Sequence, residues 1–326
     1  MQGILASVAA ILLFNITNVI SRYYAVNFDA DPTVFTCVRL IGTAFILILF
    51  AGPGHLVTST LKVPHTWIFG ASAVLINITI MYGLTFMTAT DFSAIYRLDM
   101  IFGMIIGALF FRRYLQWKDS LGALLVISGA CLILSMQEAA IRPLSILVLG
   151  IAIFFSVVMV FMTETHPVWK KAKDSWRDRA RVVGWVIFVT SIMVLLMIIA
   201  GSFLRDTLLN HGQTLPGIFE VLPSNGALQD KKLILIAFLL GATIGGPMFI
   251  LYFLAGSKAK SEVYMMVASI GPIFNYAIEK CFSIMGLLEI RELSLTDSIA
   301  FSLIVFGSIF LILNRQNLNR KRISSE

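Results

Sequence analysis

The 326 residues of this chain are 58% hydrophobic and only 13% charged, and the formal net charge is +7. A soluble domain carries about 25% charged residues, so this composition excludes a soluble globular protein and leaves no room for a separate soluble domain. The positive charge lies in short connections between apolar segments, where membrane insertion and anionic lipid account for it better than nucleic-acid binding does.

Ten apolar segments of roughly 18–24 residues follow one another along the chain, and each is long enough to cross a hydrocarbon core of about 30 Å. We refer to them as spans 1 to 10. We expect them at residues 2–25, 33–51, 66–87, 91–111, 118–136, 143–163, 183–204, 233–255, 262–286 and 295–313. The sequence therefore predicts an all-α membrane protein with ten transmembrane helices.

Lys and Arg residues gather on alternate connections between these spans. The even-numbered connections and the C-terminal segment hold 16 of the 25 basic residues, whereas the odd-numbered connections hold five. Because basic residues favour the cytoplasmic side of a membrane, this distribution predicts that both termini are cytoplasmic. The compact chain has no recognisable targeting segment, which favours a bacterial inner membrane.

The spans divide into two sets of five. Because five is odd, the second set must be inverted relative to the first, as in many secondary transporters whose substrate site lies between the halves. A serine followed three residues later by a tyrosine occurs in span 4, at Ser93 and Tyr96, and again in span 9, at Ser261 and Tyr264. We expect a first five-helix repeat at 1–138, a second, inverted repeat at 142–313 and a basic cytoplasmic tail at 314–326.

Short motifs extend over nearly the whole chain. Span 1 contains Phe14-Asn15-x-x-Asn18, span 2 carries Arg39 after a turn with Pro32, and span 9 carries Gly271-Pro272. This pattern resembles the drug/metabolite transporter superfamily, in particular its ten-span EamA-like members. The resemblance implies two inverted five-helix repeats around a cavity lined by spans 1, 3, 4, 6, 8 and 9. The chain lacks the family's proline in span 4, where Asp99 lies near that position.

Ionisable side chains deep in a bilayer are costly, so they mark a cavity or an ion pair. Span 4 contains Arg97 and Asp99, which would point about 200° apart on a continuous helix and so could not share one face. We interpret Arg97 as binding an anionic group of the substrate and Asp99 as binding a cation or a proton. The alternative for both is an interhelical salt bridge that locks span 4. Arg39, Glu279 and Lys280 are candidates either for ion coupling or for salt bridges that tether helices.

Polar and aromatic side chains extend the candidate substrate site. Tyr96 and Tyr264 occupy matched positions, and a ring with a hydroxyl suits a small organic substrate. The amides of Asn15 and Asn18 in span 1 and of Asn275 in span 9 need polar partners in a dry site, so they are further candidates.

Prolines inside spans predict bends, because proline lacks the N–H that the helix needs and its ring clashes with the preceding turn. We expect hinges at Gly246 and Pro247 in span 8 and at Pro272 in span 9. Asp119 and Asp297 precede spans 5 and 10 after short turns, and we interpret both as helix caps.

The sequence lacks the Gly-x-x-x-x-Gly-Lys-Ser/Thr phosphate loop and the His-Glu-x-x-His zinc motif, so we expect no ATP hydrolysis, no metal, no cofactor and no enzymatic activity. The favoured function is a secondary transporter that moves a small polar or zwitterionic, amino-acid-like metabolite by alternating access. A flippase for a lipid-linked headgroup is the alternative, followed by an intramembrane enzyme that modifies lipid. The expected partners are a small-molecule substrate and the bilayer, not nucleic acid, and a homodimer is left open.

Overall fold

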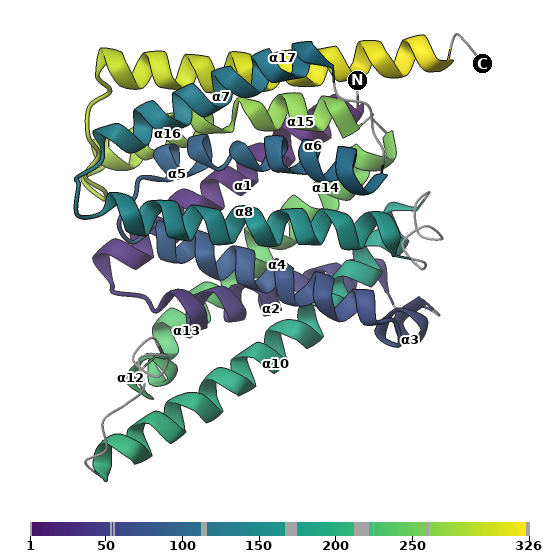
Figure 1. Ribbon diagram of the computed structural model, residues 1–326. Coiled ribbons are helices and arrows are strands. Elements are labelled where there is room, and N and C mark those ends of the chain that lie inside the picture. The colour runs from purple at the N-terminus through teal and green to yellow at the C-terminus, as the bar shows by residue number, and fades with distance from the viewer. Residues whose placement is uncertain are drawn as a thin grey trace.

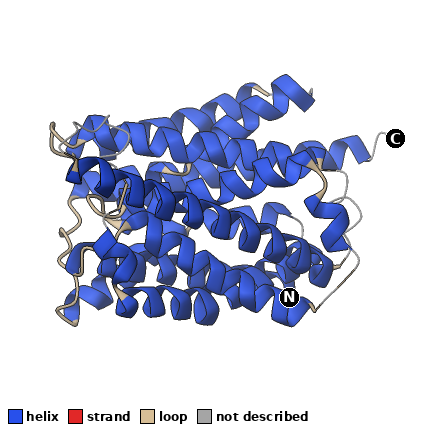
Figure 2. Ribbon diagram, turned by 90° about the horizontal axis from the view of Figure 1, so that it is seen from below, coloured by secondary structure: helices blue, strands red, loops and turns tan. Residues whose placement is uncertain are grey.

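The computed structural model describes residues 2–52, 54, 56–111, 116–166, 175–211, 222–223, 225–258 and 261–323. Over these residues the backbone forms helices, turns and loops, and no strand. The expected all-α membrane class is therefore confirmed. The helices run from one end of the bundle to the other, and their connections gather at the two ends (Figure 2).

Each expected span corresponds to one helix or to consecutive helices (Figure 1). The helices are α1 (Gln2–Asn27), α2 (Pro32–Ala51), α3 (Leu56–Leu61), α4 (Pro64–Gly83), α5 (Ala89–Ile95), α6 (Leu98–Phe111), α7 (Trp117–Met136), α8 (Arg142–Thr165), α10 (Trp176–Asn210), α12 (Asn225–Gln229), α13 (Lys231–Leu240), the π-helical turn η1 (Gly241–Gly245), α14 (Gly246–Lys258), α15 (Ser261–Ser269), α16 (Gly271–Ile284) and α17 (Leu295–Ile323). Two helices are longer than expected, because a helix satisfies its own backbone hydrogen bonds and can extend beyond the hydrocarbon core. These are α10, with 35 residues, and α17, which makes the predicted tail helical as far as Ile323.

Within the described residues, nine segments are long and apolar enough to cross a membrane. The expected span 9 is not one of them, because it is divided into α15 and α16, which have 9 and 14 residues. The division falls at Ile270, directly before Gly271 and Pro272, where a proline prevents the preceding helix from continuing. The count of ten therefore depends on taking α15 and α16 as one span, and it stays a prediction.

Span 4 is divided as well, which the sequence did not reveal because no proline lies there. α5, which has 7 residues, ends at Ile95 with Tyr96 as its C-cap, and Leu98 begins α6, which has 14. The start of α5 is fixed by Thr88, whose hydroxyl accepts a hydrogen bond from the N–H of Asp91 at 2.9 Å. Both divided spans thus consist of a short helix followed by a helix of 14 residues.

The main helix contacts join the first half of the chain to the second. α7 packs on α17, α4 on α8, α2 on α10, α1 on α14 and α5 on α16, and in addition α2 packs on α13 and η1, and α4 on α10. In span numbers, these pairs are 5 with 10, 3 with 6, 2 with 7, 1 with 8, 4 with 9, 2 with 8 and 3 with 7. If each span is exchanged with the span five places away along the chain, the same set of pairs results. A twofold relation between the two halves would produce this pattern. Figure 1 shows α7 and α17 at one edge of the bundle and α10 beside α12 at the other.

Span 8 remains helical at its proline by forming a π-turn. Pro247 has no N–H to donate, and the N–H of Gly246 reaches back five residues to the carbonyl of Gly241. This turn lies against α2, where the hydroxyl of Thr43 donates to the Gly241 carbonyl at 3.2 Å. The backbone at Gly246 and Pro247 is therefore helical in this structure, and their role as a hinge stays a prediction.

Candidate functional site

The break in span 4 carries three of the predicted site residues. Tyr96 ends α5 with its ring stacked on Phe92, and the ring centroids are 6.0 Å apart. Arg97 lies between α5 and α6, and its Nε donates to the carbonyl of Ser93 at 3.4 Å. Asp99 lies in the first turn of α6. Because the helix is interrupted between Tyr96 and Leu98, the angle expected between Arg97 and Asp99 on a continuous helix does not apply.

Arg97 and Asp99 form no close ion pair with the side chains that the structure describes. The Oδ1 atom of Asp99 is buried and has no hydrogen-bond partner in the described part of the chain. A negative charge in the first turn of a helix is stabilised by the helix dipole. The salt bridge considered as an alternative for span 4 is therefore absent from these residues.

Tyr264, the predicted site residue of span 9, lies in α15. Its ring packs edge-on against Tyr252 of α14, with 4.8 Å between the centroids. Nothing in the sequence distinguished Tyr252 from a helix-packing residue. A shared site formed by Tyr264 and Arg97 stays a prediction.

Span 1 supplies buried amides beside the divided span 9. Asn15 is 1% exposed and Asn18 is 7% exposed. The Nδ2 of Asn15 donates to the carbonyl of Ile11 at 2.7 Å. Its Oδ1 lies 3.6 Å from the point where a Cβ on Gly271 would stand, so Asn15 faces the break between α15 and α16. Asn18, one turn further along α1, lies on the same side of the helix.

Asn275 and Glu279 lie in a different cluster, where α16 meets the start of α5. Glu279 is 1% exposed, and its carboxylate accepts hydrogen bonds from Arg22, Ala89 and Thr90. Asn275, one turn earlier on α16, donates from Nδ2 to the carbonyl of Ala89 at 3.2 Å. We call these five residues the Glu279 cluster. Of the two roles expected for Glu279, the structure contains the salt bridge, and Asn275 contacts the start of α5, away from Arg97 along this helix.

Arg39 and Lys280 have separate surroundings. The buried Arg39 donates from Nη2 to the Oδ1 of Asn77 on α4 at 3.0 Å, so it tethers α2 to α4. Lys280 lies 4.0 Å from the exposed carboxylate of Glu292. Surface pairs of this kind contribute little to stability.

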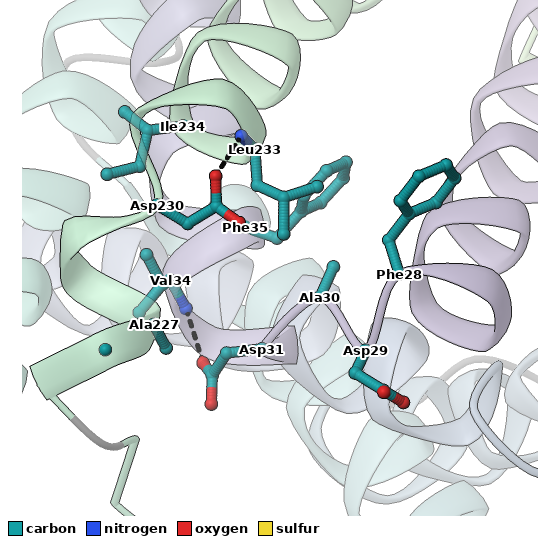
Figure 3. A pocket seen from close by; sticks show the side chains of 11 residues that line it. Phe28, Asp29, Ala30, Asp31, Val34, Phe35, Ala227, Asp230, Leu233 and Ile234 are labelled. Atoms are coloured by element: carbon teal, nitrogen blue, oxygen red, sulfur yellow. Dashed lines mark hydrogen bonds between the residues drawn. The ribbon is translucent and has the colours of Figure 1, made fainter.

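A pocket of about 260 Å³ lies between the α1–α2 turn and the start of α13 (Figure 3). Three carboxylates line it, from Asp29, Asp31 and Asp230. Asp31 accepts from the N–H groups of Thr33 and Val34, and Asp230 accepts likewise at the start of α13, so both act as helix caps. Burial raises the pKa of the Asp31 carboxyl, and the two N–H groups oppose this rise.

An apolar groove of about 510 Å³ separates α6 from α8. Its walls include Phe102 and Phe110 of α6 and Phe154 and Phe161 of α8, and the rings of Phe110 and Phe161 are 5.5 Å apart. Asp99, Phe102, Ile106 and Phe110 follow one stripe of α6 at helical spacing. The groove therefore lies along the helix face that begins at Asp99.

Comparison with known proteins agrees with this architecture. Residues 1–135 match the model of the EamA-like transporter family, and the expected resemblance to the EamA-like drug/metabolite transporters is confirmed by this match. A crystal structure described only as that of a protein is similar over 97% of this chain and 98% of its own, with a TM-score of 0.55 and 16% sequence identity, which shows a shared fold. No curated protein sequence matches the chain significantly. The comparisons thus show similarity to EamA-like transporters over residues 1–135 and a shared fold over nearly the whole chain.

Proposed function

We propose that this protein is a secondary transporter that moves a small polar or zwitterionic, amino-acid-like metabolite across the membrane by alternating access. The observation that carries the proposal is the buried Oδ1 of Asp99, which has no hydrogen-bond partner among the described residues and lies two positions from Arg97 at the break of span 4. A buried carboxylate oxygen without a partner costs free energy, and a ligand that supplies a hydrogen-bond donor would remove this cost.

The side chains around the break fit the two ends of an amino-acid-like molecule. A guanidinium binds a carboxylate through two parallel hydrogen bonds, so Arg97 would hold the acidic group. Asp99 would accept hydrogen bonds from the ammonium group. The rings of Tyr264 and Tyr252 would cover the apolar part of the substrate.

The arrangement of the helices supports alternating access between two inverted five-helix halves, 1–138 and 142–313. The divided spans repeat a short-then-long pattern, and the exchange of halves preserves the packing pairs. The charge pattern orients both termini to the cytoplasm of a bacterial inner membrane, so α5 begins and α16 ends on the outer side. α5 packs on α16 there, whereas α6 packs on α8 and α15 on α17, which closes the outer side in this state.

A second candidate, a flippase for a lipid-linked headgroup, is favoured by the groove between α6 and α8. An amphiphile could place its polar headgroup at Asp99 and its tail beside Phe102 and Phe110. Both candidates use the residues at the break and differ in whether the ligand has an apolar tail.

The test is a thermal-shift screen of the purified full chain against amino acids and related metabolites, followed by lysophospholipids and other single-chain amphiphiles. A ligand of the folded state raises the melting temperature by mass action. We expect a polar metabolite to do so, to lose the effect in Arg97→Ala, and to keep it in Lys231→Ala, which removes an exposed positive charge elsewhere. A shift from tailed amphiphiles alone would support the flippase, and hits retained in Arg97→Ala would contradict the proposed site.

A further inference from the structure

We propose that the Glu279 cluster is the latch of the outer gate, and that α5 connects this latch to the substrate site at Arg97. The inference rests on the proposed transport function and orientation, and it names the residues that close the site to the outside. Glu279 is a positioning residue in this scheme, because it acts on α5 and not on the substrate.

Glu279 joins three segments that are distant in sequence. Its Oε1 accepts from Nη1 of Arg22 in α1 and from the N–H of Ala89, both at 2.8 Å. Its Oε2 accepts from the N–H of Thr90 at 3.2 Å and from the Thr90 hydroxyl at 2.5 Å. Arg22 is 257 positions away from Glu279, and Ala89 is 190. One carboxylate therefore holds α1, α5 and α16 together at the outer side.

The partners in this cluster depend on one another. The first N–H groups of a helix have no acceptor within that helix, so Ala89 and Thr90 need the carboxylate as much as it needs them. A carboxylate that is 1% exposed cannot exchange these donors for water. Separation of α5 from α16 would remove two N–H donors and the Thr90 hydroxyl from the carboxylate at once, so the contact forms or breaks as a unit.

Further contacts tighten the same closure. Asn275 donates to the carbonyl of Ala89 at 3.2 Å, from the face of α16 that carries Glu279. Asn27, near the end of α1, donates to the carbonyl of Leu287 at 3.1 Å. The rings of Tyr23 and Phe282 meet edge-on, with centroids 6.2 Å apart. The latch is thus a polar centre within a wider contact between α1, α5 and the end of α16.

α5 is a short rigid link between the latch and the substrate site. Its 7 residues span about 10 Å, with the latch partner Thr90 in its first turn and Arg97 two residues beyond its end. A displacement of Arg97 by a bound substrate therefore reaches the latch through a single helical segment. Occupancy of the site and closure of the gate become coupled in this way.

The test uses a buried reporter under the latch. Met87, directly before the Thr88 cap of α5, is 4% exposed. Met87→Cys is made in a chain whose native cysteines are replaced, and its reaction with a charged maleimide is followed in lipid nanodiscs without substrate. We expect Glu279→Gln, which keeps the size and removes the charge, to raise the labelling rate at least tenfold. Glu292→Gln removes a carboxylate that is 92% exposed on the same side and should leave the rate unchanged.

Thr90→Val provides a milder variant that keeps the Arg22–Glu279 pair and removes only the hydroxyl donor. We expect it to fold with an unchanged elution profile and to raise the labelling rate by a smaller factor than Glu279→Gln. Equal rates in the parent, Thr90→Val and a folded Glu279→Gln would overturn the latch, and so would an equal increase in Glu292→Gln.

The link through α5 is tested by adding the ligand found in the thermal-shift screen. We expect the ligand to change the labelling rate of Met87→Cys by several-fold, and Arg97→Ala to abolish this change. If Glu279→Gln raises the labelling rate but no metabolite binds in the screen, the result supports the gate and contradicts the proposed substrate. A bound ligand that leaves the rate unchanged would overturn the link.

Discussion

A single methyl group at Gly241 should destabilise this protein strongly, because α2 and η1 approach there without room for a side chain. A Cβ on Gly241 would overlap the carbonyl oxygen of Arg39 and lie 2.8 Å from its carbonyl carbon and 2.9 Å from the N of Thr43. These contacts involve backbone on both sides, so the two helices must separate. Overpacking of this kind costs about 1–3 kcal/mol, and loss of the Thr43–Gly241 hydrogen bond adds about 1 kcal/mol. We therefore expect Gly241→Ala to lower stability by roughly 2–4 kcal/mol.

The assay is thermal unfolding of the purified protein in detergent, where such a loss corresponds to a decrease of about 5–15 °C. Gly103→Ala is the matched control, because nothing lies within 4 Å of its added Cβ. Alanine favours a helix over glycine by about 1 kcal/mol, so this control should be neutral or stabilising. Equal melting temperatures for the two variants would refute the close approach of α2 and η1.

Three further predictions concern separate parts of the molecule. Arg97→Ala should weaken binding of an anionic or zwitterionic ligand by about 10–100-fold in a titration, since a charged hydrogen bond contributes about 1.5–3 kcal/mol. An unchanged affinity would show that Arg97 does not bind the ligand. Burial, followed by the charge of His65, lowers the pKa of His166, whose Nε2 lies 2.8 Å from the Thr66 hydroxyl. The native state then binds fewer protons than the unfolded state, so the melting temperature should fall as pH drops below about 6.5, and His166→Gln should flatten this dependence. Asp297 is buried, accepts from the N–H and hydroxyl of Ser294 at 2.9 and 2.8 Å and pairs with Arg291. Asp297→Ala should therefore cost about 1–2 kcal/mol in thermal unfolding, and a neutral result would contradict its role in capping the start of α17.

The caps illustrate what local sequence can predict well. Asp119 and Asp297 were expected to cap helices from a place before spans 5 and 10. Each lies instead in the first turn of its helix, where its carboxylate accepts from the backbone N–H of the capping residue, Gln116 or Ser294. A cap depends on residues within one turn, so the sequence contains the whole interaction. The break at Gly271 and Pro272 is predictable for the same reason, since proline acts on its own helix.

The division of span 4 was not predictable in this way. No glycine or proline lies between Phe92 and Asp99, and the hydropathy of the segment is that of a continuous span. Its two helices are held by different partners, α5 by α16 and α6 by α8. The Glu279 cluster shows the same limit, because Glu279 stood out as a charge in an apolar span, yet its partner Arg22 lies 257 positions away.

The sequence by itself determined the membrane class, the sites of most spans and the residues that carry charge into the bilayer. These follow from apolar length and composition, which are sums over neighbouring residues. Only the tertiary structure decided that span 4 breaks at Tyr96, that Tyr264 packs on Tyr252, and that Glu279 binds the start of α5. Such pairings depend on which helices pack together. A hydrophobic segment carries little information about its neighbours, because its apolar surface can be buried against any other apolar face.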